Sequence, residues 1–252
     1  MKRVQWGFST IGCPELSLKE ASELGKKYGY PLVEVRVRGT DFAEKELLKQ
    51  LAAEKRCFIL GSSFRLISDS DEAREELKSC ALLAAECGIP YIRAFGGCGY
   101  DEKPDFDPCE RARKNLAFFD QLDLPAELIL ETHDYFSSSS RITALFASLG
   151  RKLPIIWDSF HTWNSSKESP AQTWEQLGET ILDIHVKDGD SEKLALPGKG
   201  KYPLEELFAL LKEKNYTGMV TCEHEKLWRP YLPELSEAFT ALEPYRKKFE
   251  NA

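Results

Sequence analysis

The sequence predicts a closed barrel of eight parallel strands, with a helix after each strand, in a single domain over residues 1–252. Short runs rich in Ile, Leu and Val alternate with amphipathic helical segments along the whole chain. Alternation of this kind forms a parallel sheet with right-handed crossovers. Eight such units in 252 residues have the size of a (β/α)8 barrel. An open doubly wound sheet is the alternative, but no Gly-x-Gly-x-x-Gly motif follows the first strand.

Each expected strand is a short apolar run flanked by turn residues, which is the pattern of a buried parallel strand. The first helix has clear ends, because Ser17 and Glu20 have capping-box spacing and Gly29 follows its last turn. The expected strands are residues 3–9, 32–37, 57–64, 90–95, 127–132, 153–158, 181–187 and 218–223. The expected helices are residues 18–28, 43–55, 71–87, 110–121, 139–149, 173–179, 204–214 and 233–249.

Four of these strands carry a side chain that can bind a metal at or near their carboxyl end. These side chains are Glu131, Asp158, His185 and Glu223, on the fifth to eighth strands. In an α/β barrel the carboxyl ends of the strands meet at one face, where active sites lie. Carboxylates and imidazoles are costly to bury without a partner. A divalent cation is the simplest partner that all four could share.

Strand alternation predicts which other polar residues face the lumen, because successive side chains of a barrel strand point inward and outward. A lumen this polar near its top indicates a functional site, since a purely structural lumen is filled by Val, Ile and Leu. The expected inward sets are Asp183, His185 and Lys187; Glu131 and His133; Thr221, Glu223 and Glu225; and Glu34 and Arg36.

The net charge and the composition indicate which classes of binding partner the protein is expected to lack. The formal net charge is −7, which argues against a nucleic-acid partner because phosphate binding needs a basic surface. Seven cysteines without a Cys-x-x-Cys pair fit reduced thiols in the cytoplasm. No apolar stretch has the length of a signal-peptide core or a membrane span. We therefore expect an acidic cytoplasmic protein without a membrane or nucleic-acid partner, and a homo-oligomer is left open.

Several motifs together resemble the xylose isomerase-like TIM barrels, a superfamily of sugar isomerases, 3-epimerases, inosose dehydratases and apurinic-site endonucleases. The resemblance covers essentially the whole chain. It implies that Glu131, Asp158, His185 and Glu223 bind one divalent ion (Mn, Mg, Co or Zn), and that His161 contacts substrate oxygens. The motifs are Glu131-Thr-His133, Asp158-Ser-Phe-His161, His185-Val-Lys187-Asp188, Gly198-Lys-Gly200 and Tyr216-Thr-Gly-Met-Val-Thr-Cys-Glu223.

The expected function is a metal-dependent isomerase or epimerase acting on a sugar, sugar acid or sugar phosphate. Such reactions remove a proton from carbon next to a carbonyl, and a metal stabilises the enediolate as a Lewis acid. Glu131 and Glu223 are the expected catalytic acid and base, one on each face of the substrate. The residues do not choose between epimerisation, isomerisation and β-elimination.

Four further residues are expected to bind substrate: His161, His133, Lys187 and Arg36. Each has a structural alternative. His161 could be a loop histidine whose hydrogen bonds are made within the protein. His133 could donate a hydrogen bond to a metal ligand without contacting the metal or the substrate. Lys187 could form a salt bridge to Asp188 or Glu225, and Arg36 could pair with Glu34 in the lumen.

Two glycine-rich loops also lie at strand ends. Residues 96–99 do not form a phosphate loop, because they lack its Gly-Lys-Ser/Thr ending. We expect this flexible loop to form a mobile rim over the site. The Gly198-Lys199-Gly200 loop after the seventh strand is a weak indication of a phosphorylated substrate.

Three other functions are alternatives to a sugar isomerase or epimerase. An inosose-type dehydratase would use the same metal and differ in losing a hydroxyl group. An apurinic-site endonuclease-like hydrolase uses three zinc ions and needs histidines on strands three and four, yet no histidine precedes His133. A noncatalytic sugar-binding barrel is disfavoured by the intact ligand set, whose own alternative is a buried ion-pair network without metal.

Overall fold

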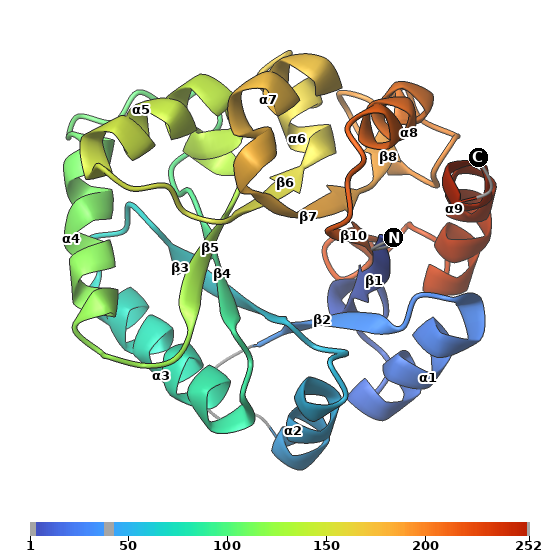
Figure 1. Cartoon of the computed structure of the whole chain (residues 1–252), viewed down its shortest axis with the longest axis horizontal. Coiled ribbons are helices and arrows are strands. Elements are labelled where there is room, and N and C mark those ends of the chain that lie inside the picture. The colour runs from blue at the N-terminus through green and yellow to red at the C-terminus, as the bar shows by residue number, and fades with distance from the viewer. Residues whose placement is uncertain (1–3, 38–42, 251–252) are drawn as a thin grey trace.

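Eight parallel strands close into a barrel with helices around it (Figure 1). The computed structural model describes residues 4–37 and 43–250. The strands follow the order β1-β10-β7-β6-β5-β4-β3-β2, and β1 closes the ring by pairing with both β2 and β10. The predicted (β/α)8 barrel is confirmed. Residue 3, where the first strand was expected to begin, lies outside the described residues.

The strands lie where the apolar runs predict them, and most ends differ by one or two residues. Lys187 and Glu223 follow their strands directly instead of ending them. A short antiparallel pair, β8 (Asp188–Gly189) and β9 (Leu194–Ala195), was not predicted. The barrel strands are β1 (Gln5–Ser9), β2 (Leu32–Arg36), β3 (Ile59–Arg65), β4 (Tyr91–Phe95), β5 (Glu127–Glu131), β6 (Ile155–Asp158), β7 (Ile181–Val186) and β10 (Met219–Cys222).

The expected helices are present, and the capping box of Ser17 and Glu20 begins the first one. Two helices start earlier than expected, because Asp107 and Ser169 cap them just before a proline at the first helical position. No helix of the described part of the chain is long and apolar enough to cross a membrane. The helices are α1 (Leu18–Tyr28), α2 (Lys45–Ala53), α3 (Asp71–Cys87), α4 (Pro108–Asp120), α5 (Ser139–Leu149), α6 (Ser159–Asn164), α7 (Pro170–Leu177), α8 (Leu204–Glu213) and α9 (Leu235–Glu250), with 3₁₀ turns η1 (Thr10–Gly12), η2 (Asp134–Ser137) and η3 (Gly178–Thr180).

The lumen is apolar at one end and polar at the other. A small cluster separate from the main core is formed by Leu32, Ile59, Ile129, Ile156 and Met219. Each lies in the first half or at the middle of its strand, and the residue two positions later on β2, β5 and β6 is a carboxylate. Because side chains alternate along a strand, these carboxylates face the same lumen nearer the carboxyl ends. The fold therefore places a polar layer where a barrel carries its active site.

Candidate metal centre

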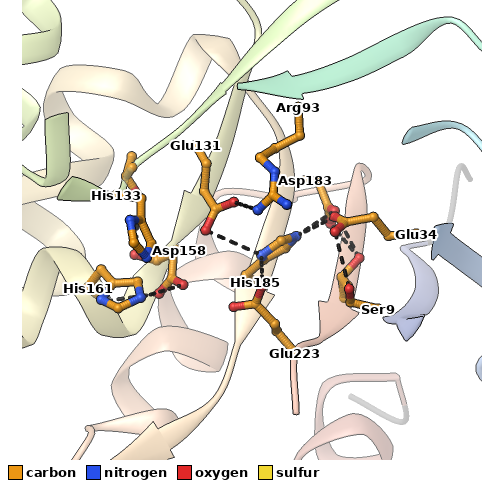
Figure 2. Close-up of polar contacts among 12 residues, drawn as sticks. Ser9, Glu34, Arg93, Glu131, His133, Asp158, His161, Asp183, His185 and Glu223 are labelled. Atoms are coloured by element: carbon orange, nitrogen blue, oxygen red, sulfur yellow. Dashed lines mark hydrogen bonds and ion pairs between the residues drawn. The ribbon is translucent and has the colours of Figure 1, made fainter. Parts of the chain in front are cut away.

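The structure brings the four predicted metal ligands together (Figure 2). Glu131, Asp158, His185 and Glu223 each offer one ligand atom, and these atoms all lie within 4.8 Å of one another. Each residue is at most 4% exposed. Asp158 and His185 are register partners on β6 and β7. Side chains almost a hundred residues apart in sequence thus share one buried point at the carboxyl end of the barrel.

The His185 ring connects two groups of carboxylates. Its Nδ1 lies 3.1 Å from Glu223 Oε1 and 4.0 Å from Glu131 Oε1. Its Nε2 lies 2.8 Å from Glu34 Oε2 on β2. Burial alone would lower the pKa of His185, but Glu223 and Glu34 raise this pKa well above its ordinary value. The ring therefore sits in a strongly negative environment on both sides.

Two buried cations hold one oxygen of each glutamate. Arg93 Nη1 lies 2.6 Å from Glu131 Oε2, and Lys187 Nζ lies 2.6 Å from Glu223 Oε2. The other oxygen, Oε1, faces His185 Nδ1 in both cases. Each carboxylate therefore has one oxygen held by the protein and one directed to the shared point.

Lys187 also bridges two further carboxylates. Its Nζ lies 2.6 Å from Asp158 Oδ2 and 2.5 Å from Glu225 Oε1. The salt bridge to Glu225 that the sequence offered as an alternative is present. Burial opposes the charge on Lys187, but Asp158 and Glu223 raise its pKa well above the ordinary value. Lys187 is an ammonium ion inside the ligand set, and substrate contact from it stays a prediction.

Arg93 is a site residue that the sequence analysis missed. It is 3% exposed, and its guanidinium lies 3.8 Å from the centroid of the Phe95 ring. The available signal was one charged residue at the centre of the apolar run Tyr-Ile-Arg-Ala-Phe on the fourth strand. A charge in such a run must meet an opposite charge or a polar partner.

The charges of this layer fit a divalent cation. Among the described residues, Arg93 and Lys187 supply the permanent positive charge, with one imidazole from His185. Burial raises the pKa of Asp158 to about 7 against the opposing effect of Lys187, and burial raises that of Asp183 to about 6. Six buried or partly buried carboxylates lie around these two permanent cations, so the layer has more potential negative charge than positive charge. These six carboxylates belong to Glu34, Glu131, Asp158, Asp183, Glu223 and Glu225.

The ligand chemistry agrees with the charges. His185 Nδ1 has no well-aligned hydrogen-bond partner within the described ranges, although it is buried and faces carboxylates. Three carboxylates with one imidazole form an oxygen-rich set that suits Mn²⁺, Mg²⁺ or Co²⁺ and also admits Zn²⁺. The residues therefore fit the expected metal.

A second cluster joins the two predicted substrate-binding histidines. The Tyr100 hydroxyl lies 3.0 Å from His133 Nε2 and 3.0 Å from His161 Nδ1. His133 Nδ1 lies 2.8 Å from Asp134 Oδ1, and His161 Nε2 lies 3.4 Å from Asp158 Oδ2 (Figure 2 shows both histidines beside Asp158). Burial, together with Lys187 and His133, lowers the pKa of His161 well below its ordinary value. A neutral imidazole thus borders the metal ligands.

Asp158 has a second role that explains the unexpected helix α6. Its Oδ1 accepts the backbone N–H of His161 at 2.9 Å and caps the helix. The cap fixes His161 one turn from the ligand set. Asp158-Ser-Phe-His161 is therefore a helix start as well as a candidate ligand motif.

The glycine-rich loop after β4 carries Tyr100, which the sequence analysis also missed. Gly97 N–H donates to Asp134 Oδ2 at 3.3 Å, and Arg141 Nη1 donates to the Tyr100 carbonyl at 2.9 Å. A Cβ at Gly96 would lie 2.7 Å from the His133 carbonyl oxygen. The loop is therefore packed and bonded against the end of β5, and a movement of this rim would have to break these contacts.

Arg36 lies on β2 and reaches toward β3. Its Nη1 donates to the Gly61 carbonyl at 2.7 Å, and its Nη2 donates to Ser63 Oγ at 2.5 Å. Glu34, the alternative partner, contacts His185 and Ser9. Substrate contact from Arg36 stays a prediction. His224 lies outside the ligand set, and its Nε2 contacts the Pro233 carbonyl at 2.8 Å.

Asp188 organises the Gly198-Lys199-Gly200 loop. Its Oδ2 accepts the N–H groups of Gly198 (2.8 Å) and Gly200 (3.0 Å). Its Oδ1 accepts those of Gly189 (2.7 Å) and Tyr202 (3.0 Å). The two glycine amides that could have bound a phosphate therefore bind a carboxylate of the protein, and the weak indication of a phosphorylated substrate loses its basis in this loop.

Replacing Asp188 with Ala is expected to lower the free energy of unfolding by about 3 kcal/mol, because four N–H groups lose a charged acceptor. Urea denaturation measures this change, and hydrogen exchange at Gly198 and Gly200 should become faster. Asp190→Ala is the matched control, since Asp190 accepts from Glu192 and Lys193 in an exposed turn. An equal loss in both variants would contradict this role of Asp188.

Comparison with known proteins gives one family and a set of similar structures. The family model described as a xylose isomerase-like TIM barrel matches residues 22–245. No curated protein matches the sequence. Three solved structures illustrate the likeness, and at their identities it shows the fold alone.

The IolI protein with a bound zinc atom has 18% identity and a TM-score of 0.72, over 98% of both chains. The probable 3-DHS dehydratase AsbF of Bacillus anthracis has 16% identity and a TM-score of 0.74, over 95% of this chain and 99% of its own. The D-allulose 3-epimerase of Methylomonas sp. in complex with D-allulose has 17% identity and a TM-score of 0.74, over 98% of both chains.

Proposed function

Because the chain belongs to the xylose isomerase-like TIM barrel family, we propose that it is a divalent-metal-dependent sugar isomerase or epimerase. The substrate is a sugar, sugar acid or sugar phosphate with a carbonyl beside the carbon that loses its proton. One observation carries the proposal. Glu131 ends β5 and Glu223 directly follows β10, and each directs one oxygen toward His185 Nδ1. Two carboxylates converging from different strands can serve one substrate as base and acid.

Glu131, Asp158, His185 and Glu223 would hold the ion, which is Mn²⁺, Mg²⁺, Co²⁺ or Zn²⁺. When bound, it supplies Lewis-acid stabilisation of the negative charge that develops on substrate oxygens. The bound zinc atom of the similar IolI structure supports a metal in a protein of this fold.

The protein's own residues do the remaining work in this proposal. One glutamate removes the proton next to the carbonyl, and the other returns a proton to the opposite face or to the neighbouring carbon. Arg93 and Lys187 keep the two carboxylates apart by holding one oxygen of each. His161, His133, Lys187 and Arg36 are the proposed contacts to substrate hydroxyl and carbonyl groups.

A dehydratase is the second candidate, and the imidazole–phenol cluster favours it. β-Elimination removes the same proton and expels a hydroxyl, which leaves as water once it is protonated. His133, whose pKa Asp134 raises against the effect of burial, could supply that proton through the Tyr100 hydroxyl, which also contacts His161 beside Asp158. The similarity to the probable dehydratase AsbF supports this alternative, as does the inosose-type reaction expected from the sequence. An endonuclease-like hydrolase fits poorly with four histidines and a charge of −7.

The metal can be tested before any substrate is known. Elemental analysis of protein purified without chelator is expected to give one divalent ion per chain. Removing the ion should lower the free energy of unfolding. Adding it back at a free concentration of 100 times its Kd should raise this free energy by about 2.7 kcal/mol. Asp158→Asn should weaken this stabilisation, whereas Asp120→Asn at an exposed surface pair should not. Protein without bound metal and without a metal-dependent shift would refute the centre.

The reaction is tested by incubating the metal-loaded protein with ketoses, inososes and 3-dehydro acids in D₂O. An isomerase or epimerase gives a new sugar with deuterium at the carbon next to the carbonyl, observed by proton NMR. A dehydratase gives a conjugated product with ultraviolet absorbance and no epimer. Metal-loaded protein that binds sugar but exchanges no proton would point to a noncatalytic barrel.

A further inference from the structure

Glu34 lies across the lumen from the metal ligands, on the other side of the His185 ring (Figure 2). We infer that Glu34 is a positioning residue of the metal centre. It accepts the Nε2–H of His185 and so leaves the Nδ1 lone pair of that ring for the cation. The inference rests on the proposed metal centre and adds a residue that binds neither metal nor substrate.

Metal binding needs the neutral ring. Its tautomer then follows from which ring nitrogen has a well-aligned acceptor: Nε2 has one in Glu34, whereas Nδ1 has none among the described residues. A neutral imidazole has one N–H and one lone pair, and an ionised carboxylate only accepts. Nε2 lies 2.8 Å from Glu34 Oε2, which is a hydrogen-bond distance. Nδ1 faces the oxygens of Glu223 and Glu131. With the proton on Nε2, the lone pair of Nδ1 is directed into the ligand set, as metal binding requires.

Glu34 is itself held in place. The Ser9 hydroxyl donates to Glu34 Oε1 at 3.2 Å, so the two carboxylate oxygens have different partners. Gly61 on the neighbouring strand β3 provides the space, because a Cβ there would lie 3.2 Å from Glu34 Oε1 and 3.1 Å from Arg93 Nη2. Glu34 as a residue is 5% exposed, and β2 is paired with β1 and β3 on its two sides.

Asp183 is the nearest competitor for this role, and its contacts argue against it. Its Oδ2 lies 3.6 Å from His185 Nε2, beyond a hydrogen bond. Its oxygens instead accept the Thr221 hydroxyl (2.8 Å to Oδ2) and the Ile184 N–H (2.8 Å to Oδ1). Glu34 and Asp183 therefore carry similar charge beside the same ring nitrogen, but the hydrogen bond goes to Glu34.

This difference gives a matched set of variants. Glu34→Met keeps the length of the side chain and removes the acceptor. Glu34→Gln removes the charge but keeps an oxygen that can accept from Nε2–H. Asp183→Asn removes a neighbouring charge without changing the partner of the ring. Competition with a chelator measures Zn²⁺ affinity for each, and thermal unfolding of the metal-free proteins checks that they fold.

Glu34→Met is expected to weaken Zn²⁺ binding by about 10–100-fold, as loss of the partner of a metal-binding histidine does. Glu34→Gln and Asp183→Asn should stay much closer to wild type. Nitrogen-15 NMR of histidine-labelled, Zn²⁺-loaded wild type should show His185 bound through Nδ1 and protonated on Nε2, and Glu34→Gln should retain this state. That spectrum does not depend on whether Glu34→Met folds.

Two results would overturn the inference: zinc bound through Nε2 in the wild type, or wild-type affinity in a folded Glu34→Met variant. Neither would remove the proposed metal centre. A wild type that binds no Zn²⁺ would instead refute the centre itself, and with it the role of Glu34.

Discussion

Replacing Arg93 with Met is expected to lower the free energy of unfolding of the metal-free protein by about 3–5 kcal/mol. Arg93 Nη1 lies 2.6 Å from Glu131 Oε2, and both side chains are almost completely buried. Without the guanidinium, the negative charge of Glu131 stays in a low-dielectric lumen beside Glu34 and Glu223. Because methionine fills much of the same space, the decrease in the free energy of unfolding comes mainly from the missing charge. Chemical denaturation in the presence of a chelator measures it.

Two controls separate this explanation from a packing defect. In the double variant Arg93→Met with Glu131→Gln, the uncompensated charge is absent, so part of the stability should return. Arg151→Met removes the same kind of side chain from a half-exposed pair with Asp120, and should cost no more than about 1 kcal/mol. If Arg93→Met were as mild as the surface variant, Glu131 would not depend on Arg93 for its charge.

The fold was predictable because its signals are local and repeated. Eight apolar runs separated by amphipathic segments restrict the topology to a barrel or an open sheet, and the barrel is confirmed. The capping box at Ser17 is likewise contained in four residues. The β8–β9 pair and α6 were missed because each is too short to show a period. The start of α6 depends on Asp158, whose position in the sequence suggested only a metal ligand.

The ligand set was predictable for a different reason. A barrel turns the ends of distant strands into neighbours, so residue type and strand position were enough to bring Glu131 and Glu223 together. Which residues cross the lumen depends on side-chain length and the stagger of the strands. The contact between Glu34 and His185 joins residues 151 positions apart. Nothing in one sequence pairs them, and strand alternation indicated Arg36 as a possible partner of Glu34.

The contacts of Arg93 and Tyr100 could not be predicted from the pattern of polar and apolar residues along the strands. Arg93 is one charge in an apolar run, which signals an unidentified partner without naming Glu131. Tyr100 lies in a loop, which has no regular alternation of side-chain direction from which its orientation could be predicted. It meets His133 and His161 because the loop is bonded to Asp134 and Arg141. Contacts of this kind depend on the folded loop and become visible only in three dimensions.

Replacing either Glu131 or Glu223 with Gln is expected to lower turnover by about 100-fold or more. Glutamine keeps the shape and one metal-binding oxygen but cannot take up and release a proton at the working pH. Metal occupancy should fall less than turnover, and the fold should remain. Turnover on the substrate found in the D₂O screen, with metal content measured on the same samples, tests this expectation. Glu225→Gln is the matched control, because Glu225 shares Lys187 with Glu223 but lies outside the four-ligand set.

The two variants differ in a way that identifies an epimerase. With one of two bases left, exchange of the substrate proton with solvent can persist after net conversion is lost. The Glu131→Gln variant should exchange the proton of one epimer, and the Glu223→Gln variant that of the other, because each remaining carboxylate serves one face of the carbon. An isomerase that uses one face would lose exchange in only one variant. If both variants kept near wild-type turnover, the glutamates would be metal ligands alone. The base would then be sought among the other groups of this layer, first at His161 and His133, because Lys187 is held as an ammonium ion by its carboxylates.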